Sequence, residues 1–315
     1  MLIFALDANK TFASALAADL DESLAAHEDR AFEDGEHKLR PLVDPRGDDC
    51  YVVASLHGDL QASPHDKLVA LLAFIATLRD HGARRVTAVV PYLAYARKDR
   101  RTKPFDPVTL RYVAQWFEAS GCDQLITLEA HNVAAFDNAF RRPAIHLEAH
   151  RLFDAPATDG PLAVVSPDPG GVKRVQLWRE WLQARLSREI GFAMIDKRRS
   201  AGVVSSDRLV AGDVAGGTAL LYDDLIASGE TMLRAAQALR RAGARDVIAF
   251  AAHGLFIAPA PELLADAAIS RIVVSDSVPP FRLIANGAVA RKLHVISAVP
   301  LFAQAIRDCH ESWTG

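Results

Sequence analysis

The chain has 315 residues, enough for two domains of about 150 residues each. Half of it is hydrophobic and 24% is charged, a composition that excludes an intrinsically disordered protein. A net charge of −3 gives no overall basic field for binding nucleic acid. The most apolar stretch, Leu68–Leu78, reaches only about half a membrane span, and MLIFALDANK lacks the basic start of a signal peptide. We therefore expect a cytoplasmic protein with neither a nucleic-acid nor a membrane partner.

Apolar runs of strand length alternate with helical patterns along nearly the whole chain. The expected strands are 51–54, 86–90, 125–128, 162–165, 219–222, 247–251 and 272–274, and the expected helices are 66–79, 108–119, 172–186 and 231–242. Alternation of this kind, with strands that are apolar throughout, is typical of parallel sheets covered by helices on both faces. The sequence therefore predicts an α/β fold. The three separate cysteines are expected to be reduced core thiols.

The domain organisation follows from the segment DAPATDGP at 154–161, which interrupts the pattern of strands and helices. Each half of the chain contains a strand that leads through a polar turn into a helix. This is compatible with two related domains. We expect domains at 1–153 and 154–299, and a C-terminal helix at 300–315 that packs back on the first domain.

The strongest chemical signal is LLYDDLIASGET at 220–231. Asp223 and Asp224 end an apolar strand, and a loop of small residues then leads into a helix. Ligands of open parallel sheets bind beyond the carboxyl ends of strands, and backbone N–H groups at a helix start suit a phosphate. The two carboxylates suit sugar hydroxyls or a metal; the alternative is an acidic turn that caps the helix.

Two other segments carry weaker signals. In SPDPGGVKR at 166–174, Asp168 is expected either to hold a cation or to cap the helix that follows. In DKRR at 196–199, three cations in a turn after a strand suit a movable phosphate clamp. A solvated basic turn is the alternative for the second segment.

The first half contains PYLAYARKDRR at 91–101, in which cations and tyrosines alternate. This run suits a nucleotide triphosphate, or it forms a solvated face. His131 follows the expected strand 125–128 and is either a metal or phosphate contact or a structural histidine. The sequence contains neither a GxxxxGK[ST] loop nor a GxGxxG loop, so ATP would be bound without them.

Taken in order, these segments resemble ribose-phosphate diphosphokinase, also called phosphoribosyl pyrophosphate (PRPP) synthetase. The resemblance runs from about residue 31 to 280 and includes AFEDGE at 31–36 and GDVAG at 212–216 as well as the segments above. It implies two phosphoribosyltransferase-like domains, each a parallel sheet flanked by helices, with an active site at the domain interface. It also implies a homo-oligomer and Mg²⁺-dependent transfer of the ATP diphosphoryl group to the 1-hydroxyl of ribose 5-phosphate, which gives PRPP and AMP.

The resemblance assigns ATP to the first domain and ribose 5-phosphate to the second. The ATP residues would be Phe32 against adenine, Asp34, Gly35 and Glu36 at the nucleoside, and Arg97 and Lys98 at the phosphates. The sugar-phosphate residues would be Asp223 and Asp224 at the hydroxyls, and Ala227, Ser228, Gly229, Glu230 and Thr231 at the 5-phosphate. His131 and Asp168 would contact Mg²⁺ directly or through water. The catalytic residues would be Lys197, Arg199 and His131.

The sequence departs from the family pattern at several of these positions. Ala227 replaces an aspartate, Glu230 replaces a glycine, Lys98 replaces a glutamine, and Glu129-Ala130 replaces Asp-Leu. The carboxylate of Glu230 would either repel the phosphate or point away from it. We interpret the chain as an active member of a divergent or archaeal-like subgroup.

Three alternatives remain at this stage. The first is the same chemistry on another sugar phosphate, suggested by Ala227 and Glu230. The second is a non-catalytic regulatory subunit, which the presence of all the expected catalytic residues disfavours. The third is a salvage phosphoribosyltransferase, which would be shorter and would not need AFEDGE or YARKDRR.

Overall fold

The computed structural model describes residues 1–6, 10–200, 203–283 and 287–314; the side chains of 197–208 and 313–314 lie outside the description. The chain divides into two compact units. The first unit comprises 1–148 and 298–315, and the second comprises 149–297. Among the described helices, none combines the length and the apolar character needed to cross a membrane. All three cysteines are free and buried, as predicted.

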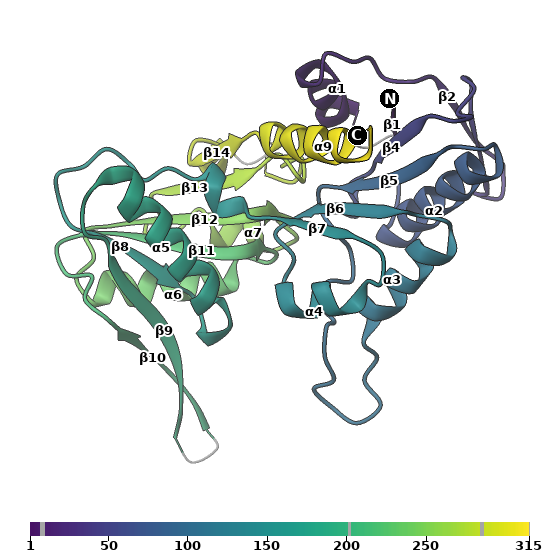
Figure 1. The fold of residues 1–315 in the computed structure, drawn as a ribbon. Coiled ribbons are helices and arrows are strands. Elements are labelled where there is room, and N and C mark those ends of the chain that lie inside the picture. The colour runs from purple at the N-terminus through teal and green to yellow at the C-terminus, as the bar shows by residue number, and fades with distance from the viewer. Residues whose placement is uncertain (7–9, 201–202, 284–286, 315) are drawn as a thin grey trace. The chain divides into compact units, whose positions relative to one another are not determined.

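The first unit is built on a five-stranded parallel sheet with the order β1-β4-β5-β6-β7 (Figure 1). The antiparallel hairpin β2–β3, which follows α1 in the sequence, forms a separate two-stranded sheet. The elements are β1 (Leu2–Ala5), α1 (Lys10–Asp19), β2 (His27–Ala31), β3 (His37–Pro41), β4 (Asp49–Val53), α2 (Pro64–Asp80), β5 (Arg85–Val90), α3 (Thr109–Ala119), β6 (Gln124–Leu128), α4 (Val133–Ala139), β7 (Ala144–Leu147) and α9 (Val299–Thr314).

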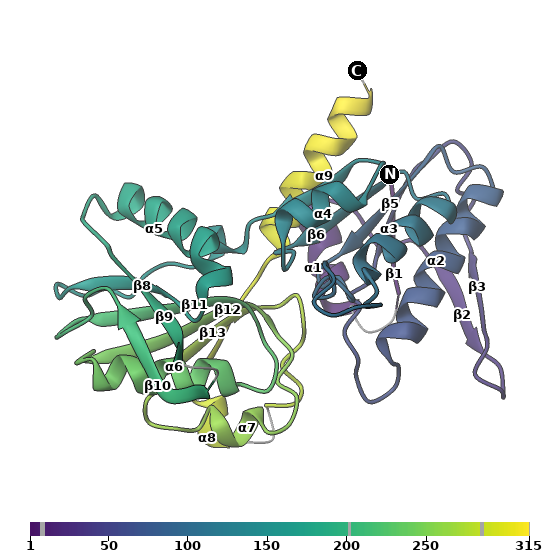
Figure 2. The ribbon, with the colours of Figure 1, turned by 90° about the horizontal axis from the view of Figure 1, so that it is seen from below.

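Helices cover both faces of this sheet, so successive strand residues pack into different layers (Figure 2). Val52 and Ala88 belong to a core cluster with the buried face of α2 and α3. The opposite face is covered by α1 and α9, where the rings of Phe12 and Phe302 meet edge to face with their centroids 5.5 Å apart. The last helix of the chain is thus part of the core of the first unit.

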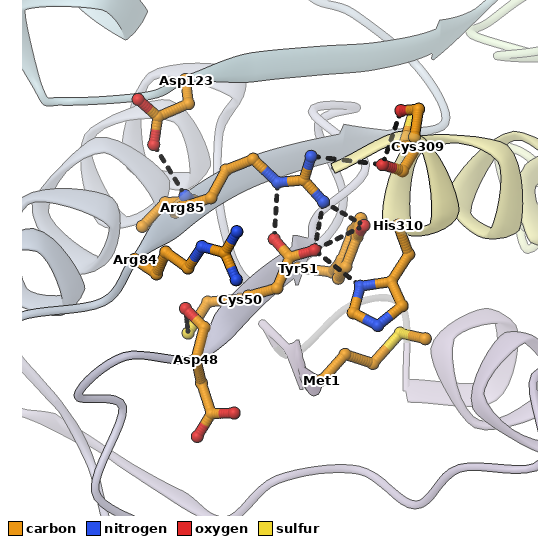
Figure 3. A network of polar contacts seen from close by, with 12 residues as sticks. Met1, Asp48, Cys50, Tyr51, Arg84, Arg85, Asp123, Cys309 and His310 are labelled. Atoms are coloured by element: carbon orange, nitrogen blue, oxygen red, sulfur yellow. Dashed lines mark hydrogen bonds and ion pairs between the residues drawn. The ribbon is translucent and has the colours of Figure 1, made fainter. Parts of the chain in front are cut away.

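A buried polar network fastens α9 to the sheet (Figure 3). Arg85 Nε donates to Asp49 Oδ1 at 2.7 Å, and Arg85 Nη1 donates to the carbonyl of Cys309 in α9 at 3.3 Å. Asp49 Oδ2 also lies 2.8 Å from His310 Nδ1. Burial alone would raise the pKa of Asp49, but the bonds from Arg85 and His310 outweigh it and hold that pKa below its usual range.

The second unit contains a seven-stranded sheet with the order β10-β9-β8-β11-β12-β13-β14. All neighbours are parallel except β9 and β10, which form an antiparallel edge. The elements are β8 (Leu162–Ser166), α5 (Val172–Leu186), β9 (Gly191–Ser200), β10 (Val203–Ala211), β11 (Thr218–Ile226), α6 (Glu230–Arg241), β12 (Asp246–Gly254), α7 (Ala260–Leu263), β13 (Arg271–Ser275), α8 (Gly287–Ala290) and β14 (Leu293–Ile296).

Helices α5 and α6 cover opposite faces of this second sheet (Figure 2). Under α5, Trp178 packs against Tyr222 and Phe250 with centroids 5.1 and 4.8 Å away, and its indole N–H donates to the carbonyl of Phe153 at 3.0 Å. Under α6, small residues such as Ala235 let the helix approach the strands closely. The α/β architecture with helix-flanked parallel sheets confirms the predicted fold class.

One local prediction differs from the structure, and one hairpin was not predicted. The segment 196–199 was expected in a turn, but β9 continues through it to Ser200, and Asp196, Lys197, Arg199 and Ser200 pair with β10. Charged side chains are compatible with this part of β9. Beyond Met194 the strand pairs with β10 alone, at the edge of the sheet, where charged residues are common. The hairpin β2–β3 was not predicted either, because its charged residues lack the apolar alternation of a buried strand.

Candidate active site

The residues predicted to bind the nucleoside form the turn of the β2–β3 hairpin. The Phe32 amide donates to the Glu36 carbonyl at 2.7 Å, and the Glu36 amide donates to Asp34 Oδ1 at 3.1 Å. Gly35 has φ +91°, which favours glycine. Phe32 as a residue is 45% exposed, and the Arg30 guanidinium lies over one face of its ring, 4.9 Å from the centroid. The turn therefore presents an aromatic face on which a base can stack.

The residues predicted to bind the ATP phosphates follow β5 in a tight turn. The Lys98 amide donates to the carbonyl of Tyr95 at 3.1 Å, and Tyr95 has φ +65°, an outlier for a bulky residue. Arg97 is exposed, whereas Lys98 Nζ lies 2.6 Å from Asp106 Oδ2. Arg97 is thus the more available cation, and the charge of Lys98 is partly balanced within its own loop.

Asp106 organises that loop. Its Oδ2 accepts hydrogen bonds from the Thr102 amide at 3.0 Å, the Thr102 hydroxyl at 2.8 Å and the Lys103 amide at 3.0 Å. The bond from Lys98, followed by those from Thr102, holds the pKa of Asp106 well below its usual range. The pairing of Lys98 with Asp106 was not predicted, because the two residues are eight positions apart in an irregular part of the chain.

His131 is exposed in the turn that follows β6. Its neighbour Asn132 donates from Nδ2 to Asp99 Oδ2 at 2.6 Å and accepts from the Ala135 amide at 3.2 Å, capping α4. Since Asp99 belongs to the turn after β5, this bond joins the two turns at the carboxyl end of neighbouring strands. The structure therefore joins the turn that carries Arg97 and Lys98 to the turn that carries His131.

In the second unit, Asp168 lies at the carboxyl end of β8. Its Oδ1 accepts from the amides of Gly170 and Gly171 at 2.8 and 3.2 Å, so the aspartate caps the turn that leads into α5. The cap fixes the direction of the carboxylate. Its contact with a metal stays a prediction.

Asp223 and Asp224 lie near the carboxyl end of β11, which pairs with β8. Arg174 Nη1 lies 3.6 Å from Asp223 Oδ1 and 3.8 Å from Asp224 Oδ1. Burial raises the pKa of Asp223 well above its usual range, and the charge of Asp224 raises it further. Arg174 was missed as a site residue, although it belongs to the SPDPGGVKR segment. The structure shows that this segment and the acidic pair form one cluster.

The predicted phosphate loop leads from β11 into α6. Gly229 has φ +79°, and a Cβ at this position would lie 3.1 Å from Leu264 Cγ. The first amides of α6 cannot be bonded within the helix, so they can donate to an anion. The Glu230 carboxylate lies 2.9 Å from Arg234 Nη2, on the exposed flank of α6. Glu230 thus has a cation of its own one turn along the helix.

Lys197 and Arg199 lie in β9, where they pair with Arg208 and Val204 of β10. Their side chains lie outside the described residues, so the predicted contacts of both with substrate stay predictions. Over the part of the chain that is described, the structure does not gather three or more His, Cys, Asp or Glu side chains into a group that could hold a metal.

Comparison with known proteins identifies the family. Residues 1–121 match the N-terminal domain of ribose phosphate pyrophosphokinase, and 203–314 match the phosphoribosyl synthetase-associated domain. A ribose-phosphate pyrophosphokinase from Caldanaerobacter subterraneus is 35% identical over 98% of this chain and 94% of its own. The chain belongs to the ribose-phosphate pyrophosphokinase family.

Other members of the ribose-phosphate pyrophosphokinase family agree with this assignment. The enzyme of that name from Pasteurella multocida is 34% identical over 88% of this chain and 85% of its own. The crystal structure of phosphoribosylpyrophosphate synthetase from Mycobacterium smegmatis matches with a TM-score of 0.88, at 31% identity over 99% of both chains. The resemblance noted from the sequence is thereby confirmed, together with the two-domain phosphoribosyltransferase-like fold.

Proposed function

We propose that this protein transfers the β,γ-diphosphoryl group of ATP to the 1-hydroxyl of ribose 5-phosphate, giving PRPP and AMP. The observation that carries the proposal is the cluster of Arg174, Asp223 and Asp224 next to the loop that begins α6. It combines acceptors for sugar hydroxyls with backbone donors for a phosphate. Membership of the family supplies the reaction.

The first unit would bind ATP. Phe32 would stack on adenine, and Asp34, Gly35 and Glu36 would bind the nucleoside at the hairpin turn. Arg97 would contact the triphosphate, while Lys98 would do so only by sharing its charge with Asp106. The turn with His131 is joined to the same loop through Asn132 and Asp99, which supports a role for His131 close to the phosphates.

The second unit would bind ribose 5-phosphate. Asp223 and Asp224 would accept from the ribose hydroxyls, with Arg174 balancing their charge. The loop Ala227, Ser228, Gly229, Glu230 and Thr231 would take the 5-phosphate on its backbone amides. The pairing of Glu230 with Arg234 supports retention of phosphate binding despite the carboxylate. Ala227 has no side-chain donor or acceptor to replace the aspartate found in the family.

Magnesium would be held by few protein ligands. Mg²⁺ prefers oxygen donors and is commonly bound by one or two carboxylates together with substrate phosphates and water. Asp168 offers a carboxylate whose direction is fixed by its cap, and His131 would contact the ion directly or through water. One oriented carboxylate of this kind fits a Mg²⁺ ion that arrives with ATP, and the bound ion would neutralise charge on the triphosphate.

In the transfer step, the 1-hydroxyl oxygen would form a bond to the β-phosphorus while the bond from that phosphorus to the α,β-bridging oxygen breaks, and the hydroxyl proton would pass to water. AMP is then the leaving group. Lys197 and Arg199 would stabilise the charge that develops on the equatorial oxygens, and His131 is the third residue to which the family resemblance gives a catalytic role. Losing one such cation typically lowers turnover about 10²–10³-fold.

The same proposal includes a cytoplasmic enzyme that works as a homo-oligomer, as the family resemblance implies. Two alternatives are kept. Ala227 and Glu230 favour the same chemistry on a different sugar phosphate, and a regulatory subunit would bind nucleotide without turnover.

A ³¹P NMR time course with ATP, Mg²⁺ and ribose 5-phosphate tests the reaction. We expect AMP and a sugar 1-diphosphate to appear together. Formation of ADP would refute attack at the β-phosphorus, product with another sugar phosphate alone would favour the first alternative, and intact ATP throughout would favour the second. In the same assay, Lys197→Ala should lower turnover at least about 10²-fold, whereas Arg241→Ala, which removes an exposed cation at the end of α6, should leave turnover unchanged.

A further inference from the structure

A tyrosine–histidine contact connects the proposed phosphate-binding turn to the beginning of α2. The Tyr95 hydroxyl is hydrogen-bonded to Nδ1 of His65, and the two rings lie 5.6 Å apart between centroids with an interplanar angle of 47°. Tyr95 is half-buried and precedes Arg97 and Lys98 by two and three residues, whereas His65 is exposed. Neither residue belongs to the ATP residues proposed above.

The backbone of Tyr95 has an unfavourable conformation that contacts from outside the turn must stabilise. Its φ of +65° is a conformation that aromatic residues seldom adopt without a surrounding structure that imposes it. Its ring packs against the core of the first unit, and its carbonyl accepts the amide of Lys98 at 3.1 Å. A change in the backbone of Tyr95 would therefore move the amide of Lys98 and, with it, Arg97.

His65 is attached to a rigid part of the fold. Ser63 caps α2, and its side chain and that of Asp66 exchange hydrogen bonds with each other's backbone amides at 3.3 and 2.8 Å. Pro64 fixes the first helical residue. One residue further on, Lys67 Nζ lies 2.5 Å from Asp59 Oδ2. The imidazole therefore extends from a backbone that is held on both sides.

We propose that His65 and Tyr95 act as a pair of positioning residues for ATP. Their hydrogen bond holds the left-handed backbone of Tyr95 in the free protein, so that the turn already has the shape in which Arg97 meets the triphosphate. The binding energy of ATP then need not be used to order the turn. This inference rests on the proposed contact between Arg97 and the ATP phosphates.

The test compares Tyr95→Phe and His65→Ala with the unaltered protein. A non-hydrolysable ATP analogue is titrated by calorimetry, and the KM values of both substrates are measured. We expect either variant to weaken the analogue and raise the KM of ATP about three- to tenfold, as one lost hydrogen bond would, while the KM of ribose 5-phosphate stays within twofold. The double variant should be no weaker than either single variant. His65→Asn, whose amide can replace Nδ1, should restore binding to within twofold.

Two controls separate the possible outcomes. Tyr112→Phe removes a phenol hydroxyl from α3 of the same unit and should change neither KM. Arg97→Ala tests the proposed function itself and should weaken the analogue more than Tyr95→Phe does. If Arg97→Ala weakens binding and Tyr95→Phe does not, the positioning role is refuted while the ATP contact stands. If both leave binding unchanged, the ATP contact is refuted, and the positioning role with it. Equal loss for both substrates would show a structural effect and also refute the inference.

Discussion

Replacing Asp223 by asparagine should show how much the ionisation of the acidic pair lowers the free energy of unfolding of the ligand-free protein. Burial and the charge of Asp224 raise the pKa of Asp223 well above its usual range. Its side chain is 21% exposed, and the nearby Arg174 guanidinium, 3.6 Å away, compensates only part of the penalty. At pH values between the ordinary and the raised pKa, the folded protein therefore binds a proton that the unfolded chain has lost.

The sign and the size of the effect follow from this difference of one proton. A raised carboxyl pKa contributes stability that is complete below the unfolded pKa and is lost as the pH rises through the folded pKa. Within that window the unfolding free energy falls by about 1.4 kcal/mol per pH unit, or about 3–5 °C of melting temperature for a unit of this size. The amide of an asparagine cannot titrate, so Asp223→Asn should become more stable relative to the unaltered protein as the pH rises.

Thermal unfolding of ligand-free protein at about pH 4.5, 5.5 and 6.5, followed by tryptophan fluorescence, measures this difference directly. Titrating groups that do not interact with Asp223 cancel because both proteins contain them, so the difference reports the acidic pair of Asp223 and Asp224. Asp159→Asn is the matched control, since Asp159 is exposed in the same unit; it should show no comparable trend. A difference between Asp223→Asn and the unaltered protein that stays constant with pH would refute the reasoning.

Three further predictions concern other parts of the molecule. Arg85→Met leaves the buried carboxylate of Asp49 without its main partner, so urea titration should show an unfolding free energy lower by about 3–5 kcal/mol; a loss below about 1 kcal/mol would argue against the network. Glu230→Gly should change the KM of ribose 5-phosphate less than about twofold, because Arg234 already pairs with the carboxylate of Glu230. Arg234→Ala should raise this KM about two- to fivefold, because it leaves that carboxylate without its cation. A KM that is more than twofold lower in Glu230→Gly would show that the carboxylate repels the phosphate despite the pairing. Burial raises the pKa of Cys122 to about 12, so Ellman's reagent should label this thiol only after unfolding, and rapid labelling of the native protein would contradict its burial.

The sequence was most informative where one physical signal dominates. The continuous apolar runs at β5 and β11 predicted parallel strands, because a strand buried on both faces needs apolar residues throughout. The sequence also predicted that Asp223 and Asp224 lie near the end of a strand and that a loop then leads into a helix, and the structure has this arrangement; their binding of ribose 5-phosphate stays a prediction. Domain boundaries expected at 153/154 and 299/300 stay predictions.

Other features depend on residues that are distant in the chain or on backbone conformations without a sequence signature. The carboxylates of Asp223 and Asp224 meet Arg174 only because β8 and β11 are neighbours. Tyr95 has a left-handed backbone that its residue type argues against. The charged segment in β9 lacks the apolar alternation of a strand, so its local pattern favoured a turn.

The position of α9 has a consequence for biosynthesis. The chain forms most of the first unit before the second, yet the carbonyl of Cys309 bonds with Arg85 across 224 residues of sequence. The second unit, 149–297, is continuous in sequence, whereas the first unit is complete only after α9 has been synthesised. A stop codon shortly before Val299 would therefore damage the unit translated first, and nascent chains would expose the α9 face of that sheet to chaperones until α9 has been synthesised.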